Sequence, residues 1–130
     1  MAKAINWPLP FRDEILKEDC LTERIALRLG TLYFDHQFWV PGEVVDIRVN
    51  HLKVRKAIVV QPVRKTTPAQ LTPEDFKRLK TGLTDTEAVV HYLRKNYNQP
   101  VDEQTPLSVV AYKNLPVVPD EIEVADDPHL

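Results

Sequence analysis

The side chains best suited to chemistry are grouped between positions 20 and 28 of this 130-residue chain. They are Cys20, Glu23, Arg24 and Arg28. A desolvated carboxylate can act as a general base, and a thiolate beside a cation can act as a nucleophile. Glu23 and Cys20 are therefore the catalytic candidates, and Arg24 can supply the cation. The alternative interpretation is structural, with a small buried Cys20 and a Glu23 that pairs with an arginine.

Other kinds of catalytic centre are disfavoured by residue spacing. Cys20 has no second ligand at metal-binding spacing, and the four histidines are scattered along the chain: His36, His51, His91 and His129. The sequence contains no glycine-rich phosphate loop. Its one serine, Ser108, falls within a predicted strand, which argues against a Ser/His/Asp triad. We therefore predict neither a metal site nor a cofactor.

The distribution of charge points to an anionic partner. Residues 48–80 contain nine basic and two acidic side chains, whereas residues 120–130 contain five carboxylates and no Lys or Arg. A basic middle followed by an acidic end is typical of a chain that binds a polyanion, or of a tail that covers a basic surface. A solvated surface with a solubilising tail is the alternative. The overall pI of about 6.1 argues against strong binding to duplex nucleic acid.

Aromatic side chains accompany the basic ones, which favours single-stranded RNA or a nucleotide as the partner. Phosphates are bound by Lys and Arg, and unpaired bases stack on aromatic rings. Within the 31–42 loop, Tyr33 and His36 suit exposed positions, whereas Phe34, Phe38 and Trp39 suit the core. The predicted binding residues are Glu23, Arg24, Arg28, Tyr33, His36, Arg55, Lys56, Arg64 and Lys65.

The elements that position these residues are short. Eleven prolines divide the chain, which favours short strands with a few helices. Alternating or β-branched patterns predict strands over residues 4–7, 21–29, 44–49, 54–63 and 107–112. Helices are predicted from Pro10, from Thr72 to Gly82 with Pro73 at the first helical position, and over residues 87–97. Apolar runs are too short to cross a membrane, the single cysteine allows no internal disulfide, and the N-terminus lacks a signal core, so a cytoplasmic protein is expected.

Taken in order, several segments resemble the ASCH family. They are Ile5-Asn6-Trp7, residues 11–16, Pro41-Gly42-Glu43 with the strand to Val49, residues 71–75, the helix 87–97 and Ser108-Val109-Val110-Ala111-Tyr112. The resemblance covers roughly residues 4–115. It implies an α+β fold similar to PUA domains, a β pseudo-barrel of about five strands flanked by two to three helices. The domain would span residues 1–118, with an acidic tail over residues 119–130.

The resemblance also implies RNA binding or the handling of modified nucleosides, and some members remove the acetyl group from acetylated cytidine. The family signature is Gly-x-Lys-x-x-Glu-x-Arg after the first helix. Aligned without gaps, Cys20 takes the lysine slot and Glu23 the glutamate slot. In an alternative register Glu23 takes the lysine slot and Arg28 the arginine slot. Neither register supplies the lysine, and the family's downstream glutamate falls near Lys80, so catalysis is not favoured.

We therefore predict a domain that binds RNA or a modified nucleotide through a basic cleft. The cleft is expected between the first helix, the following strand and the 31–42 loop. Two alternatives remain open. One is an amidohydrolase for a small acylated nucleoside, with Glu23 or Cys20 performing the chemistry. The other is a non-catalytic protein-interaction module. The acidic tail carries a further hypothesis, that it lies across the basic region and competes with phosphate.

Overall fold

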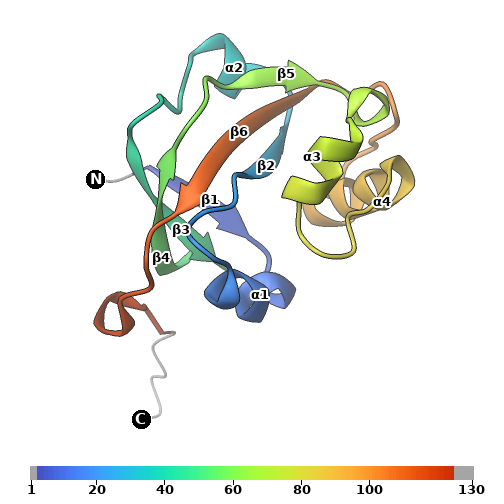
Figure 1. Cartoon of the computed structure of the whole chain (residues 1–130). Helices are drawn as coiled ribbons and strands as arrows, with labels where there is room; N and C mark the ends of the chain where they lie inside the picture. The colour runs from blue at the N-terminus through green and yellow to red at the C-terminus, as the bar shows by residue number, and fades with distance from the viewer. Residues whose placement is uncertain (1–2, 125–130) are drawn as a thin grey trace.

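The computed structural model describes residues 3–124 of the chain (Figure 1). These residues form the strands β1 (Ala4–Trp7), β2 (Arg24–Leu29), β3 (Val44–Val49), β4 (Leu52–Val59), β5 (Arg64–Thr66) and β6 (Leu107–Asn114). The α-helices are α1 (Arg12–Lys17), α2 (Leu32–Asp35), α3 (Pro73–Arg78) and α4 (Thr86–Tyr97). Short 3-10 turns cover Leu9–Phe11, Pro68–Gln70 and Pro119–Glu121. The predicted α+β class is confirmed.

The strands form one mixed sheet in the order β1-β3-β4-β6-β2, and β5 pairs with β6 outside that path. Only the β1–β3 pair is parallel among these neighbours. Within residues 3–124 no main-chain ladder joins the edge strands β1 and β2. A side chain crosses between them instead, because the Arg28 guanidinium on β2 donates to the Asn6 carbonyl on β1 at 2.9 Å.

The side chains of β2 and β6 alternate between two hydrophobic cores. On β6, Val110 and Tyr112 face the core shared with β1, β3 and β4, while Val109 and Ala111 face a core shared with α3 and α4. Successive side chains on a strand point to opposite faces, so one strand can serve both cores. In Figure 1, α3 and α4 lie together at one side of the sheet and α1 lies at its end. A site on the β6 face that α3 covers is therefore separated from a site on the opposite face of β6.

The helix beginnings follow from their capping residues. The Thr72 hydroxyl accepts from the Asp75 backbone N–H at 3.2 Å, and the Asp75 carboxylate accepts from the Thr72 backbone N–H at 3.0 Å. This reciprocal pair is a capping box, with Pro73 at the first helical position, so the predicted start of α3 is confirmed. The predicted end is wrong, because α3 stops at Arg78 rather than at Gly82.

Two strand predictions are corrected by local side chains. β2 begins at Arg24 rather than Leu21, because the Asp19 carboxylate accepts from the backbone N–H groups of Leu21 and Thr22 and folds that stretch into a turn. The predicted strand over 54–63 is β4, which ends at Val59, before Pro62, a residue with no N–H for the ladder; β5 at Arg64–Thr66 is a separate strand that was not predicted. The 31–42 segment also contains the one-turn helix α2. None of the helices within residues 3–124 is both long and apolar enough to cross a membrane.

Candidate functional site

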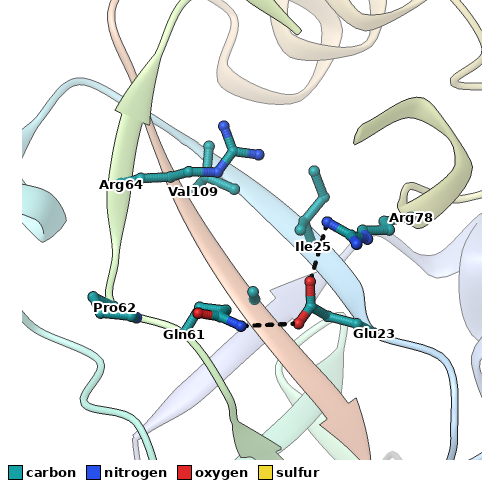
Figure 2. Close-up of a pocket in the computed structure, with 8 residues that line it drawn as sticks. Glu23, Ile25, Gln61, Pro62, Arg64, Arg78 and Val109 are labelled. Carbon is teal, nitrogen blue, oxygen red and sulfur yellow. Dashed lines mark hydrogen bonds and ion pairs between the residues drawn. The ribbon is translucent and has the colours of Figure 1, made fainter. Parts of the chain in front are cut away.

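A cavity of about 370 Å³ lies beside the start of β2, between the sheet and α3 (Figure 2). We call it the Glu23 pocket. It is lined by residues from four stretches of the chain, namely Glu23, Ile25, Gln61, Pro62, Arg64, Arg78, Val109 and Ala111. Two of these residues, Glu23 and Arg64, belong to the predicted binding set.

The floor of the Glu23 pocket is apolar because of strand alternation. Ile25 on β2 and Val109 and Ala111 on β6 point to the same face of the sheet, and Glu23, the residue before β2, lines the pocket beside them. Arg64 joins them because β5 pairs with β6 in a register that sets Arg64 opposite Val109. The result is a flat apolar floor with charged groups at its edge.

Helix α3 supplies the charged wall. Asp75 and Arg78 are three residues apart and therefore share one face of the helix. Asp75, fixed by the capping box, is buried and forms an ion pair with Arg64. Arg78 forms an ion pair with Glu23 at 3.1 Å. The capping box of α3 thus positions the guanidinium of Arg64 as well as the helix itself.

Glu23 is held from two sides. Gln61 Nε2 donates to one carboxylate oxygen at 3.5 Å, and the Arg78 guanidinium pairs with the other (Figure 2). The Glu23 side chain remains 19% exposed, so a ligand in the pocket can reach it. A fixed carboxylate, an amide and two guanidinium groups over an apolar floor can bind a small planar ligand that carries both an amine and an anionic group.

Arg28 and Tyr33 line a different cavity, of about 460 Å³, which we call the tyrosine cleft. Arg28 and Ile25 are three residues apart on β2, so their side chains point to opposite faces of the strand. The tyrosine cleft therefore lies on the face of β2 opposite to the Glu23 pocket. The residues that define it here are Asn6, Arg28, Tyr33, Tyr92, Asn96 and Tyr97. The structure therefore divides the single predicted cleft, and Glu23 and Arg28 do not converge on one cavity.

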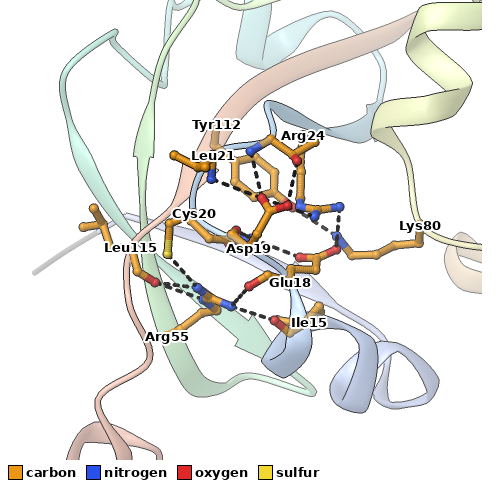
Figure 3. A network of polar contacts seen from close by, with 12 residues as sticks. Ile15, Glu18, Asp19, Cys20, Leu21, Arg24, Arg55, Lys80, Tyr112 and Leu115 are labelled. Atoms are coloured by element: carbon orange, nitrogen blue, oxygen red, sulfur yellow. Dashed lines mark hydrogen bonds and ion pairs between the residues drawn. The ribbon is translucent and has the colours of Figure 1, made fainter.

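Two predicted binding residues are occupied by contacts within the protein. Arg24 pairs with Glu18 at 3.3 Å, and its side chain is only 14% exposed. Arg55 is buried, and its guanidinium donates to the carbonyls of Ile15, Glu18 and Leu115 (Figure 3). Neither guanidinium is available to an external phosphate, so both are left out of the candidate site.

The remaining predicted residues lie apart from both cavities. Lys65 Nζ lies 5.3 Å from the centre of the Phe34 ring, and His36 is exposed at the end of α2. Cys20 is exposed rather than buried, and its Sγ lies 3.7 Å from an Arg55 nitrogen. Of the residues that line the Glu23 pocket in the described part of the chain, none carries a hydroxyl or a thiol. A nucleophile for acyl transfer is therefore not supplied by its walls.

Gln61 and Arg78 were not among the residues predicted to bind a ligand. Arg78 had a usable signal, since it lies one helical turn after Asp75 in a helix whose start was predicted. Gln61 had none, because it reaches Glu23 only through the sheet, across 38 positions of sequence. Between residues 3 and 124, no three His, Cys, Asp or Glu side chains are grouped in a way that could hold a metal ion.

The described part of the acidic tail lies on basic residues of β3 and β4. Glu121 pairs with Lys56 at 3.4 Å and with Lys53 at 3.6 Å. Glu123 accepts from the Lys53 backbone N–H at 2.8 Å and lies 3.7 Å from Arg48. The positions 125–130 of the predicted tail lie outside the described residues. Lys56, predicted to bind a ligand, is thus engaged by the tail, and competition with phosphate stays a prediction.

The contact of Glu121 predicts a pH-dependent release of this segment. A hydrogen bond from Lys56 and the charge of Lys53 hold the pKa of Glu121 below its ordinary value. A lowered pKa in the folded state means that the contact stabilises docking above the ordinary glutamate pKa of about 4.3 and is lost as pH falls through the lowered value. We expect a carboxyl-detected NMR titration to give a Glu121 pKa below that ordinary value. The Lys56→Met substitution should raise it again, and an ordinary pKa in the unaltered protein would contradict the docking.

Comparison of the chain with protein-family models, with curated proteins and with solved structures gave no match. The resemblance to the ASCH family therefore stays a prediction from short sequence motifs.

Proposed function

We propose that this chain is a PUA-like, ASCH-type domain that binds a nucleotide in the Glu23 pocket, either as a free modified nucleotide or as an unpaired residue of RNA. The supporting feature of the fold is the curved sheet whose edge strands are bridged by Arg28. The supporting feature of the site is its combination of a carboxylate, two guanidinium groups and an apolar floor.

The observation that carries the proposal is the fixed Glu23 carboxylate over the floor of Ile25, Val109 and Ala111. A carboxylate is the side chain that accepts from the amino group of cytosine. The apolar floor suits the face of a pyrimidine ring, and Arg64 at the rim suits a phosphate. Cytidine nucleotides, modified or not, are therefore the ligand class proposed here.

Binding is favoured over amide hydrolysis. In the alternative register of the family signature, Glu23 takes the place of the lysine, and its partner Arg78 lies close to the position of the family's glutamate. The charges of the pair are thus reversed relative to what the resemblance implies for amidohydrolases. The described lining of the pocket also supplies no hydroxyl or thiol that could attack an amide carbonyl.

The proposal is tested by calorimetric titration with cytidine monophosphate, acetylated cytidine and a short single-stranded RNA. We expect the Glu23→Gln substitution to weaken binding of cytidine monophosphate by about 10- to 100-fold, the value of one charge-assisted hydrogen bond. The matched control is Glu74→Gln, which removes a carboxylate from α3 that pairs with exposed Lys77. Thermal melts establish that both variants are folded.

Three outcomes would decide against the proposal. Equal affinity of the Glu23→Gln variant and the unaltered protein for cytidine monophosphate would show that the Glu23 pocket is not the binding site. Release of acetate from acetylated cytidine, followed by proton NMR, would replace binding by amidohydrolysis. If none of the three ligands bound, the protein-interaction module would be the remaining alternative. For RNA, the logarithm of affinity should fall with the logarithm of salt concentration by about 0.7 per phosphate contacted.

A further inference from the structure

We propose that the tyrosine cleft is a second binding site, for a nucleobase that carries a carbonyl oxygen at the position where cytosine and adenine carry an amino group, namely uracil or guanine. This inference does not rest on the Glu23 pocket, because the two cavities use different residues and lie on opposite faces of β2. The ligand of the tyrosine cleft is expected to accept hydrogen bonds at the position where the ligand of the Glu23 pocket donates them.

The walls of the tyrosine cleft are aromatic and held in place by packing. Tyr33 stacks on buried Trp39, with ring centres 4.6 Å apart and planes 17° apart. Tyr92 makes an edge contact with Phe11, with ring centres 5.7 Å apart. Tyr97 completes the aromatic lining from the last turn of α4. Aromatic rings that are fixed before a ligand arrives suit the stacking of a planar base.

The permanently charged side chain of the cleft, Arg28, can only donate, whereas its amide, hydroxyl and imidazole groups can both donate and accept. The Arg28 guanidinium is fixed by the carbonyls of Leu27 at 2.8 Å and Asn6 at 2.9 Å, which use two of its five N–H groups. The Asn6 side-chain oxygen accepts from the His51 backbone N–H at 2.8 Å, so the group that Asn6 can offer to a ligand is its amide nitrogen. Burial raises the pKa of Tyr92 to about 12, so its hydroxyl stays protonated at neutral pH.

The charge of the cleft supports the same ligand class. Its lining, among the residues that the structure describes, contains Arg28 and His51 but neither Asp nor Glu. A neighbouring hollow of about 390 Å³ shares Arg28, Tyr33 and Tyr97 and extends the cleft past Gly30. Uracil and guanine present carbonyl oxygens to such donors, and Arg is the usual partner of the guanine O6 and N7 acceptors. At the position where uracil and guanine carry the O4 or O6 carbonyl oxygen, cytosine and adenine carry an amino group, which matches the carboxylate of the Glu23 pocket instead.

The rim of the cleft is a fixed turn. Asn50 and His51 join β3 to β4 and have φ values of 49° and 68°, the left-handed pair that a two-residue hairpin turn requires. The Asn50 backbone N–H donates to the Trp7 carbonyl at 2.9 Å, and the Asn6 side chain holds His51. Two hydrogen bonds therefore tie the turn to β1 and keep this side of the cleft open.

The test is an amide NMR titration of the whole chain with the monophosphates of uridine, guanosine, cytidine and adenosine. Ribose 5-phosphate is the fifth titrant, because it carries the sugar and phosphate without a base. We expect uridine and guanosine monophosphates to shift the amides of Tyr33, Asn96 and Tyr97, with at least about 5-fold tighter binding than the cytidine and adenosine nucleotides. Ribose 5-phosphate should not shift them at the same concentration.

A substitution on the exposed end of α4 provides the decisive variant. Asn96→Asp places a carboxylate in the cleft, where it repels carbonyl oxygens, and should weaken uridine monophosphate binding by about 10-fold. Asn98→Asp adds the same charge two residues later, outside the cleft, in a left-handed conformation that aspartate tolerates. It should bind as the unaltered protein does.

Four results would overturn the proposal. They are the absence of shifts at the cleft with every nucleotide, equal shifts with ribose 5-phosphate, tighter binding there of the cytidine and adenosine nucleotides, and an unchanged affinity in a folded Asn96→Asp variant. The Glu23→Gln variant separates this proposal from the proposed function. It should keep its affinity for uridine monophosphate while losing cytidine monophosphate, and loss of both ligands together would contradict two independent sites.

Discussion

The Glu18→Gln substitution is expected to lower the free energy of unfolding by about 3–5 kcal/mol, the cost of removing one partner from a buried ion pair. The Glu18 side chain is 4% exposed and lies 3.0 Å from the fully buried ammonium of Lys80 and 3.3 Å from the Arg24 guanidinium. Glutamine would leave two desolvated cations facing a neutral amide (Figure 3). Urea denaturation followed by tryptophan fluorescence measures the change.

A second substitution distinguishes a buried charge from lost packing. Lys80 also lies 4.1 Å from the centre of the Trp7 ring and donates to the Tyr112 hydroxyl at 3.2 Å. Combining Glu18→Gln with Lys80→Met removes one cation with the anion, so the double variant should be more stable than the sum of the single effects implies. The exposed control Glu74→Gln should change stability by less than about 0.5 kcal/mol. A Glu18→Gln effect as small as that of the control would contradict the buried ion pair.

The buried pair has a consequence for the Glu23 pocket. Glu18 precedes Glu23 by five residues, and Lys80 follows Arg78 by two. The Glu18–Lys80 contact therefore ties the segment that leads to Glu23 to the segment that follows Arg78, and Glu23 and Arg78 pair in the pocket. A buried ion pair that lies close in sequence to a more exposed one restrains both segments, which is how a site on short elements can keep its geometry.

The outline of the fold was predictable because its signals are local. The alternation in residues 44–49 predicts a strand, and the sequence Thr72-Pro73-Glu74-Asp75 predicts the start of a helix. β3 and the start of α3 occur where predicted. The limits of β2 were not predictable from alternation alone, since the Asp19 side chain competes for the backbone of the preceding residues. Where a side chain can replace a ladder hydrogen bond, the pattern of apolar residues no longer decides the boundary.

The candidate site was harder to predict because its contacts are long-range. Glu23 and Arg64 were expected in a ligand cleft and line one, whereas Arg28 and Tyr33 lie in another. Lys80 gave no signal, since lysine is rarely buried and its partner Glu18 is distant in sequence. Arg55 had a signal that basic composition obscured. It lies at two-residue spacing from Ala57 and Val59, both buried, which places it on the buried face of β4.

Arg55 is expected to be the other residue whose loss strongly destabilises the fold. Its Nη1 donates to the carbonyls of Ile15 at 2.9 Å and Glu18 at 3.0 Å, and its Nη2 donates to the Leu115 carbonyl at 2.6 Å. These acceptors end α1 and follow β6, so a single guanidinium joins three segments. The Arg55→Met substitution keeps much of the side-chain volume and leaves the carbonyls without these donors. We expect it to cost at least about 3 kcal/mol in urea denaturation, since each buried unsatisfied group costs about 1–3 kcal/mol.

Two variants separate the geometry of this guanidinium from its charge. Arg55→Lys keeps the charge, but an ammonium cannot reproduce the planar fork that reaches three carbonyls, so its stability should fall between those of Arg55→Met and the unaltered protein. Lys56→Met changes the neighbouring residue on the other face of β4, which pairs with Glu121 at the surface, and should cost less than about 1 kcal/mol. If Arg55→Met lowered the free energy of unfolding as little as Lys56→Met does, Arg55 would be available to bind a ligand. The basic strand β4 would then again be a candidate RNA-binding surface. A large effect of Arg55→Met, with hydrogen exchange increased at the end of α1, would instead assign Arg55 to the fold and leave recognition to the two cavities.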